Sequence, residues 1–329
     1  MSLHVFLLHR PRGESALEEL TARLDPEVTL SLGPELPDPP DYKVMVAGRP
    51  ERAHVEASPK LRAVVVPWAG IPDTTRQLMH DFPHIALHNL HHNALPVAEH
   101  ALALLLAAAK FIVPMDRALR SNDWRPRYQP NPSILLEGRT ALILGYGAIG
   151  QKLGQLCRGL GMEVLGVRRK APPADAGGSD RVRLFGIEAL HRLLPRADAL
   201  LVCLPHTPET TGLVGARELA LLPRQAVLVN VGRGPVVDEE ALFSALREGR
   251  LHAAGLDVWY QYPEDEAARA NTPPASHPFH ELPNVVMSPH RAGGSTWTEH
   301  LRMVHLARLL NAAARGEPMP NRVDLDAGY

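Results

Sequence analysis

The sequence predicts an α/β protein with two doubly wound parallel sheets, each in its own domain. Short apolar runs alternate with helical patterns over residues 1–95, and the same alternation begins again near residue 140. This alternation is typical of parallel sheets whose strands are joined by helices. The length of 329 residues suits about two domains, each able to bury its own core.

Composition argues against several classes of function. The formal net charge is −1, so we expect no electrostatic attraction to nucleic acid or to an anionic membrane. The longest apolar run, 101–109, is too short to span a bilayer. The first ten residues lack the pattern of a signal peptide. Cys157 and Cys203 lie in apolar segments and are interpreted as buried reduced thiols, which indicates a cytoplasmic protein.

The first part of the chain predicts buried strands separated by helices. We expect strands at residues 5–8, 44–46, 63–66 and 85–87. Helical patterns occupy residues 14–23, 51–57 and 73–79. Short continuous apolar runs are typical of strands that are covered on both faces of a parallel sheet. No glycine-rich phosphate loop is found in this part.

A loop of unusual composition follows the expected strand at 63–66. It reads Pro67-Trp68-Ala69-Gly70-Ile71-Pro72. Open α/β sheets bind ligands at the carboxyl ends of their strands, so Trp68, Ala69 and Gly70 are candidate ligand-binding residues. Taken alone, this loop is better explained as a simple turn before a helix.

An apolar stretch, 95–107, connects the two halves. Pro96 suits the start of a helix, and uniform apolarity is typical of a helix buried on all sides. We interpret it as an inter-domain connector, a dimerisation element, or both. A long amphipathic helix is expected at 295–314. The α/β pattern of the second half is complete without this helix, so we expect it to pack in the first domain. The predicted domains are therefore residues 1–96 plus 295–329, and residues 97–294.

The second half predicts a larger α/β unit. We expect strands at residues 140–144, 164–167, 199–203, 226–229, 252–257 and 285–287. Helices fall between these strands, including one at 238–248 that Asp238 would cap at its N-terminus. The prolines at 114, 126, 130 and 132 indicate an irregular stretch before this unit.

A glycine motif directly follows the expected strand at 140–144. It reads Gly145-Tyr146-Gly147-Ala148-Ile149-Gly150 and leads into a helical pattern at 151–160. The first glycine allows a tight turn, the second lets the backbone approach a pyrophosphate, and the third lets helix and strand pack closely. Free N–H groups at the helix N-terminus favour phosphate binding. The motif therefore predicts a Rossmann-like dinucleotide site.

The residues after the next strand, 164–167, indicate which dinucleotide is bound. A site selective for NAD usually carries an acidic residue here, which holds the ribose 2′-hydroxyl. This chain has Arg168, Arg169 and Lys170 instead. Because arginine binds phosphate through paired hydrogen bonds, we favour NADP(H) over NAD(H). The alternative is that the basic turn is only solvated surface.

Two polar residues follow other strands of the second half. Arg233 lies among glycines after the strand at 226–229, and could bind a carboxylate and polarise a neighbouring carbonyl. His290 follows the strand at 285–287 in a loop of small residues, where it could exchange a proton with a substrate hydroxyl. A pair of this kind at two strand ends favours a catalytic site over two structural residues.

Other histidines do not predict a metal site. They are His80, His84, His88, His91 and His92. The first three are spaced by four, but Pro83 breaks any helix between them. The last two are adjacent and cannot point the same way on regular structure. We therefore expect no bound metal.

Taken together, these motifs resemble the D-isomer-specific 2-hydroxyacid dehydrogenases. The matching stretches are 97–100, 145–161, 204–210, 230–242, 255–258 and 288–294. They cover most of residues 61–310 in the order of the family, whereas the first 60 residues match only in pattern. The resemblance implies a substrate domain and a nucleotide domain with a cleft between them, and a homodimer built on the nucleotide domain.

The resemblance also implies residue roles. Arg233 would bind the substrate carboxylate and carbonyl, and His290 would be the acid–base group. Backbone N–H groups of Trp68, Ala69 and Gly70 would bind the substrate carboxylate. Together with the basic turn, the expected cofactor residues are Gly145, Gly147, Ala148, Ile149, Gly150, Arg168, Arg169, Pro205, Thr210, Val231, Asp257 and Gly293. Among these, Asp257 would hold the nicotinamide amide, and Pro205 and Thr210 would line the cofactor cleft.

One departure from the family affects the predicted chemistry. The family has a glutamate before the proline of its Leu-Asp-Val-aromatic-x-x-Glu-Pro segment, and this chain has Tyr262 there. A carboxylate beside a histidine raises the histidine pKa and fixes its tautomer, whereas a neutral phenol supplies little charge. Glu264, Asp265 or Glu266 could replace the missing carboxylate, because the chain from Pro263 to His280 is long and polar.

The sequence therefore predicts hydride transfer between NADP(H) and a small 2-oxo or 2-hydroxy acid similar to glyoxylate or hydroxypyruvate. One alternative is oxidation of formate, because formate dehydrogenases of this superfamily also lack the glutamate and need no proton relay. Another is a nucleotide-sensing protein without turnover, since some relatives act through nucleotide-dependent association.

Overall fold

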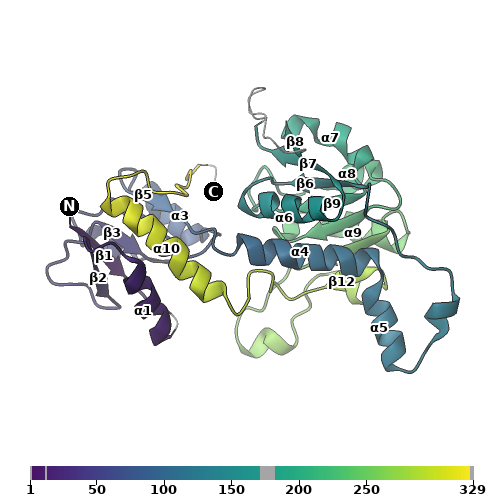
Figure 1. Cartoon of the computed structure of the whole chain (residues 1–329), viewed down its shortest axis with the longest axis horizontal. Coiled ribbons are helices and arrows are strands. Elements are labelled where there is room, and N and C mark those ends of the chain that lie inside the picture. Colours follow the sequence, from purple (N-terminus) through teal and green to yellow (C-terminus); the bar gives the residue numbers. More distant parts are fainter. Residues whose placement is uncertain (1, 12, 171–181, 327–329) are drawn as a thin grey trace. The chain divides into compact units, whose positions relative to one another are not determined.

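The computed structural model describes residues 2–11, 13–170 and 182–326. The chain divides into two compact units, Met1–Asn93 with Gly294–Tyr329, and Ala94–Gly293. Each unit has its own parallel sheet with helices on both faces (Figure 1). The predicted fold class, two doubly wound α/β units, is confirmed.

The first unit is built on a five-stranded sheet in the order β2-β1-β3-β4-β5, and all its neighbouring strands are parallel. Its strands are β1 (Leu3–Leu7), β2 (Val28–Leu32), β3 (Val44–Val46), β4 (Ala63–Val65) and β5 (Ala86–His88). The strand β2 was not predicted from the sequence. This strand lies at the sheet edge and alternates apolar residues with Thr29 and Ser31, so it contains no continuous apolar run.

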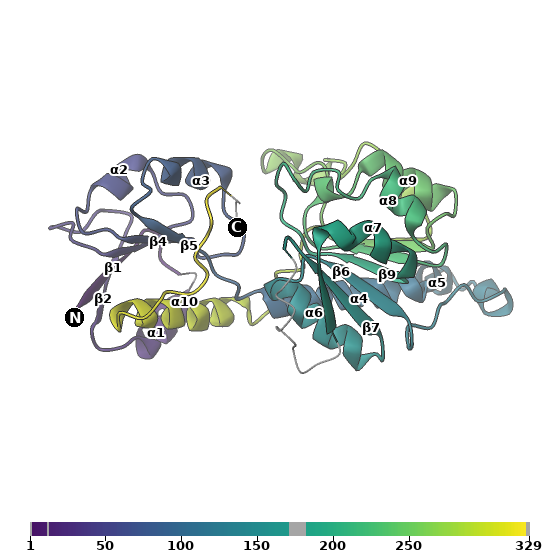
Figure 2. The same cartoon turned by 90° about the horizontal axis from the view of Figure 1, so that it is seen from above.

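Helices cover both faces of this sheet. The helices α1 (Glu14–Arg23) and α10 (Thr298–Ala314) lie side by side on one face, and α2 (Arg52–Glu56) and α3 (Asp73–His80) lie on the other (Figure 2). Leu20 and Leu306 belong to the core of the first face, and Val55 and Met79 to the core of the second. The C-terminal helix therefore completes the core of the N-terminal unit.

The second unit contains a seven-stranded parallel sheet in the order β12-β11-β10-β9-β6-β7-β8. The strands are β6 (Thr140–Leu144), β7 (Glu163–Arg168), β8 (Val182–Gly186), β9 (Ala199–Val202), β10 (Val227–Asn230), β11 (Ala253–Leu256) and β12 (Val285–Met287). Among these strands, only β8 was not predicted from the sequence. Like β2, it is an edge strand with a polar residue, Arg183, in its apolar pattern.

Two helices pack on one face of this sheet, α4 (Ala94–Ala109) and α6 (Ala148–Gly159). The other face is covered by α7 (Leu190–Leu193), α8 (Ala216–Leu221) and α9 (Glu239–Arg247). The helix α4 comes very close to β11, because a Cβ atom on Gly255 would lie 2.8 Å from Cβ of Leu104. As predicted, Asp238 caps α9, and its carboxylate accepts a hydrogen bond from Ala241 N at 2.8 Å.

The stretch expected to be irregular contains a helix, α5 (Ile112–Arg120). Pro114 lies in its first turn, where a proline removes no intrahelical hydrogen bond, so the interpretation of this proline as a helix breaker was wrong. Among the described residues, no single helix is long and apolar enough to cross a membrane, although α4 and α5, bent by 67°, pass that test as a pair. Short 3₁₀ helices complete the chain at Arg125–Tyr128, Ile187–Ala189, Leu194–Arg196, Gly234–Val236, Ala267–Ala270 and Phe279–Glu281.

Candidate active site

The glycine loop between β6 and α6 has the geometry of a phosphate cradle. Gly145 has a φ of 98°, a conformation that glycine adopts without strain. A Cβ atom on Gly150 would lie 2.4 Å from the carbonyl oxygen of Gly145, so this position requires a glycine. Gly147 is the N-cap of α6, and a Cβ atom there would meet nothing within 4 Å. The N-terminus of α6 therefore opens onto free space, which fits a bound pyrophosphate.

The basic turn after β7 lies against this glycine loop. Arg168 is exposed, and its Nε donates a hydrogen bond to the carbonyl oxygen of Tyr146 at 3.0 Å. A hydrogen bond from Thr207 is the largest cause of the lowered pKa of Glu209, and the positive charge of Arg169 also contributes. The turn thus presents two cations beside the glycine motif, in a position suited to a ribose 2′-phosphate.

Arg233 follows β10 on a backbone that packing holds rigid. The amide of the buried Asn230 accepts a hydrogen bond from Gly232 N and donates one to the carbonyl oxygen of Arg233, both at 3.0 Å. A Cβ atom on Gly232 or Gly234 would lie within 2.4 Å of a backbone oxygen. The side chain of Arg233 is exposed, donates to the carbonyl oxygen of Gly232 at 2.7 Å, and has no carboxylate partner among the described residues. It is therefore available to an anionic ligand.

His290 lies in the loop after β12, and Asp257 organises this loop. The carboxylate of Asp257 accepts hydrogen bonds from Ser288 Oγ at 2.6 Å, Arg291 N at 2.8 Å and Ala292 N at 3.0 Å. The N–H group of His290 donates to the carbonyl oxygen of Asp257 at 2.8 Å. Asp257 is only 1% exposed, so its charge is balanced inside the protein by these donors.

Burial and two charged groups, Arg233 and Asp257, determine the electrostatics at His290. Burial and the positive charge of Arg233 lower its pKa, whereas Asp257 acts in the opposite direction. The ring of Tyr262 lies 5.5 Å from the His290 ring, centroid to centroid. Burial raises the pKa of the Tyr262 hydroxyl, which therefore stays neutral near pH 7. Arg233 and His290, predicted from separate strand ends, are thus close enough to interact electrostatically.

The acidic residues after Tyr262 do not act on His290. Asp265 accepts a hydrogen bond from Ala268 N at 2.8 Å, and Glu266 pairs with Arg269 at 2.6 Å. Asp257 is the one carboxylate that contributes to the pKa shift of His290. In the part of the chain that the structure describes, the proposal that residues 264–266 replace the missing glutamate is therefore not supported.

Other predicted cofactor residues have clear structural partners. Thr210 Oγ1 donates to the carbonyl oxygen of Pro205 at 2.8 Å and accepts from Thr207 N at 2.8 Å, which closes the loop after β9. Val231 is buried. The carboxylate oxygens of Asp257 already accept the bonds from its own loop, so its predicted role toward the nicotinamide amide would require a further contact.

His100 and Ser288 were not predicted as site residues, but they contact Asp257. His100 lies on α4, and its Nε2 is 2.9 Å from Ser288 Oγ and 3.5 Å from Asp257 Oδ1. A histidine beside the long apolar run of α4 is the signal that could have indicated a polar partner.

The predicted loop Trp68-Ala69-Gly70 belongs to the other unit and follows β4. Gly48 makes room for its indole, because a Cβ atom there would lie 1.8 Å from the Trp68 ring. The carbonyl oxygen of Ala69 accepts a hydrogen bond from Asn89 Nδ2 at 2.6 Å. Among the described residues, the N–H groups of Ala69 and Gly70 have no hydrogen-bond partner, which suits donors for a carboxylate.

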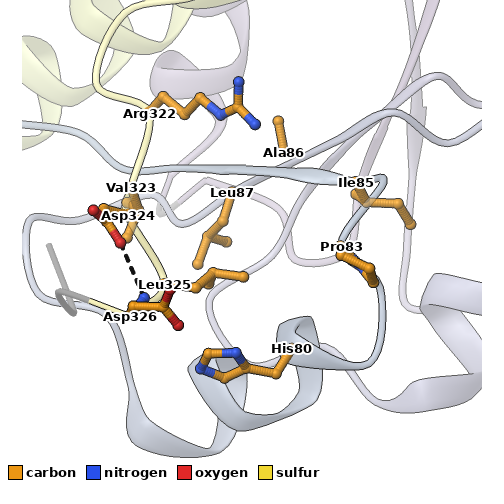
Figure 3. A pocket seen from close by; sticks show the side chains of 10 residues that line it. All are labelled: His80, Pro83, Ile85, Ala86, Leu87, Arg322, Val323, Asp324, Leu325 and Asp326. Carbon is orange, nitrogen blue, oxygen red and sulfur yellow. Dashed lines mark hydrogen bonds between the residues drawn. The ribbon is translucent and has the colours of Figure 1, made fainter.

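The first unit also contains an open cavity of about 500 Å³. Figure 3 shows it between β5 and the C-terminal segment, with His80 at the end of α3. It is lined by His80, Pro83, Ile85, Ala86, Leu87, Arg322, Val323, Asp324, Leu325 and Asp326. None of these is a predicted site residue, and their charges are of both signs. Among the described residues, no three His, Cys, Asp or Glu side chains could hold a metal ion.

Comparison with known proteins gives consistent matches. Residues 102–292 match the family model "D-isomer specific 2-hydroxyacid dehydrogenase, NAD binding domain". A glyoxylate reductase of Korarchaeum cryptofilum is 36% identical over 234 residues, which are 69% of this chain and 65% of the relative. Glyoxylate/hydroxypyruvate reductase B of Yersinia enterocolitica is 32% identical over 281 residues, which are 84% of this chain and 82% of the relative.

Solved structures agree with these matches. A D-isomer specific 2-hydroxyacid dehydrogenase from Xanthobacter autotrophicus, in complex with NADPH and MES, superposes with a TM-score of 0.78 and 26% identity. The alignment covers 100% of this chain and 99% of that one. The matched regions span 65%, 41% and 42% of the first three curated relatives, so this chain covers less than two thirds of their length.

Proposed function

The chain belongs to the D-isomer specific 2-hydroxyacid dehydrogenase family, and we propose that it reduces a small 2-oxo acid, similar to glyoxylate or hydroxypyruvate, with NADPH. One observation carries this proposal. An exposed arginine without a carboxylate partner, Arg233, lies close enough to His290 to lower its pKa. An anion-binding group beside a group that exchanges protons near neutral pH is what a 2-oxo acid requires.

The residues of the site have separate tasks in this reaction. A bound NADPH would supply the hydride for the carbonyl carbon of the substrate. Arg233 binds the substrate carboxylate through paired hydrogen bonds and polarises the adjacent carbonyl. His290 in its protonated form donates a proton to the carbonyl oxygen, so the product is a 2-hydroxy acid and His290 is left neutral. In the reverse direction neutral His290 removes the hydroxyl proton.

NADP(H) is the favoured cofactor in this proposal. The contact of Arg168 with the glycine loop supports a 2′-phosphate site at the end of β7. The NADPH complex of the Xanthobacter autotrophicus protein is consistent with it. Backbone N–H groups of Ala69 and Gly70 are proposed as further donors to the substrate carboxylate.

A second copy of the chain is the proposed macromolecular partner. Large apolar side chains are exposed on one segment of the second unit, at Ile112, Leu119, Trp124, Tyr128 and Leu135. Figure 1 shows α5 extending away from the sheet of its unit. Several exposed apolar side chains on one segment favour a protein interface, and a homodimer through this segment would cover them.

An assay of the purified protein tests the proposed function. Glyoxylate, hydroxypyruvate and other 2-oxo acids would be offered with NADPH and, separately, with NADH, while the nicotinamide absorbance is followed. We expect oxidation of NADPH with at least one small 2-oxo acid. No turnover with any acid and either cofactor would overturn the proposal. NADP(H) binding without turnover would instead support the nucleotide-sensing alternative.

Oxidation of formate is a second candidate, favoured by the phenol of Tyr262 near His290 where the family has a carboxylate. Removal of a hydride from formate releases CO₂ and needs no group that accepts a proton. Formation of NADPH or NADH from formate distinguishes this candidate directly, and the basic turn at Arg168 argues against an NAD-dependent form.

A further inference from the structure

His290 has a backbone conformation that needs support from its surroundings. Its φ is 54°, which a residue with a Cβ atom rarely adopts. Such a conformation persists only where neighbouring interactions hold it. The N–H group of His290 donates to the carbonyl oxygen of Asp257 at 2.8 Å, and Ser288 Oγ and Arg291 N donate to the Asp257 carboxylate. The loop that presents His290 is thus built around Asp257.

Ser288 links this loop to helix α4. Its hydroxyl donates to Asp257 Oδ1 at 2.6 Å, because an ionised carboxylate can only accept. Ser288 Oγ has a single proton, so at its contact of 2.9 Å with His100 Nε2 the oxygen accepts and His100 donates. The carbonyl oxygen of Ser288 also accepts a bond from Trp259 Nε1 at 2.8 Å. Ser288 is therefore fixed by hydrogen bonds with Asp257, His100 and Trp259.

His100 reaches this network from a distant part of the sequence but from a rigid element. It lies on the buried helix α4, which packs closely against β11. Its Nε2 is also 3.5 Å from Asp257 Oδ1. Asp257 is the one acidic group that acts on His290, while Arg233 acts in the opposite sense and Tyr262 is neutral. A change at His100 therefore affects both the position and the electrostatic surroundings of His290.

We infer that His100 is a positioning residue, which holds the loop carrying the proposed acid–base residue His290 through Ser288 and Asp257. This inference rests on the proposed function, in which His290 exchanges a proton with the substrate. His100 itself has no contact with reacting atoms in this scheme.

Kinetics of three variants test the inference. His100→Ala removes the donor to Ser288, and we expect kcat to fall about tenfold to a hundredfold with little change in KM, because small displacements of reacting groups have effects of this size. His100→Gln can keep a donor near the position of Nε2 and should recover most of the loss. His191→Ala removes a histidine that pairs with Glu218 at 2.7 Å in the same unit, and should leave kcat unchanged.

The pH profile separates positioning from a general loss of stability. Without His100, the Asp257 carboxylate is less compensated and raises the pKa of His290 more strongly. The pH dependence of kcat/KM in His100→Ala should therefore shift upward relative to the wild type. An unchanged profile together with an unchanged kcat would overturn the inference.

A second measurement keeps the inference testable without turnover. Titration of the His290 ring by NMR, in the wild type and in His100→Gln, His100→Ala and Ser288→Ala, reports on the same network. We expect the His290 pKa to move in both alanine variants and to stay near the wild-type value in His100→Gln. If the wild type turns over no 2-oxo acid, the proposed function fails, and this titration still decides the role of His100. Identical titrations in all four proteins would overturn it.

Discussion

The rings of Tyr262 and His290 lie 5.5 Å apart at an angle of 57°, but they share no hydrogen bond among the described residues. The Tyr262 hydroxyl accepts a hydrogen bond from Trp259 N at 3.1 Å instead. It therefore stabilises the turn after β11 and supplies no negative charge to His290. A neutral phenol at this position lacks the electrostatic effect that a carboxylate would have.

We expect the pH dependence of the wild type to reflect this arrangement. Burial and Arg233 lower the pKa of His290 from its ordinary value of about 6.5. Reduction requires protonated His290, so kcat/KM for a 2-oxo acid should fall as the pH rises through that lowered pKa. Oxidation of the 2-hydroxy acid requires neutral His290 and should show the opposite dependence. Steady-state assays in both directions check this, and equal profiles in both directions would contradict it.

Tyr262→Glu should move this profile upward. A carboxylate near His290 favours the charged imidazole and should raise its pKa by on the order of one unit, which increases reduction near pH 7. Tyr262→Phe is the matched control, because it removes the hydroxyl without adding charge and should leave the profile in place. The two profiles are compared with that of the wild type, and coincidence of all three would rule out an electrostatic role for this position.

Arg168→Asp should reverse the cofactor preference. It removes the proposed bond to the 2′-phosphate and adds an acceptor for a ribose 2′-hydroxyl. Charge-assisted hydrogen bonds are worth about 1.5–3 kcal/mol, so the affinity for NADPH should fall by about tenfold to a hundredfold, while that for NADH rises. Fluorescence titration with each cofactor measures this. Arg250→Asp is the control, because it makes the same charge change at a surface residue paired with Glu248, and it should leave both affinities unaltered. Unaltered affinities in Arg168→Asp would show that the basic turn is only solvated surface.

Two glycines of the motif should respond differently to alanine. Gly147→Ala adds a Cβ atom that meets no protein atom within 4 Å, so stability should be retained while the affinity for NADP(H) falls about tenfold or more as the pyrophosphate loses its approach. Gly150→Ala adds a Cβ atom that would lie 2.4 Å from the carbonyl oxygen of Gly145. This substitution should lower the free energy of unfolding by on the order of 1–3 kcal/mol. Thermal unfolding and cofactor titration of both variants check this contrast. Unchanged affinity in Gly147→Ala would show that no phosphate binds against this helix.

His92 should make the first unit sensitive to acid. It is 4% exposed, its Nδ1 has no hydrogen-bond partner among the described residues, and burial with Arg302, His305 and His91 lowers its pKa to about 4. The unfolded chain binds this proton near pH 6.5, so the neutral form contributes stability above that pH. This contribution is lost as the pH falls from about 6.5 to about 4, and the loss is on the order of 3 kcal/mol.

His92→Gln should therefore show a smaller difference in unfolding free energy between pH 7 and pH 4.5, measured by urea denaturation, than the wild type shows. The exposed His84 provides the matched control, and His84→Gln should behave like the wild type. Equal losses of stability in all three proteins would assign the acid sensitivity to other groups.

Local sequence patterns were sufficient where a local rule applies. Continuous apolar runs predicted the central strands such as β6 and β10, and the glycine spacing predicted the turn before α6. The same reasoning missed β2 and β8, because polar residues interrupt the apolar pattern of these two edge strands. It also missed α5, since Pro114 can lie in a first helical turn.

By itself, the sequence determined that two α/β units form, that a dinucleotide motif follows β6, and that Arg233 and His290 each follow a strand. These features depend on neighbouring residues and on the periodicity of apolar side chains. Only the tertiary structure decided that Asp257 uses its carboxylate to hold the loop of His290, and that His100 reaches Ser288 across 188 positions of the sequence. Packing of α4 against β11 brings these groups together, and no pattern within either segment encodes a contact between residues so far apart.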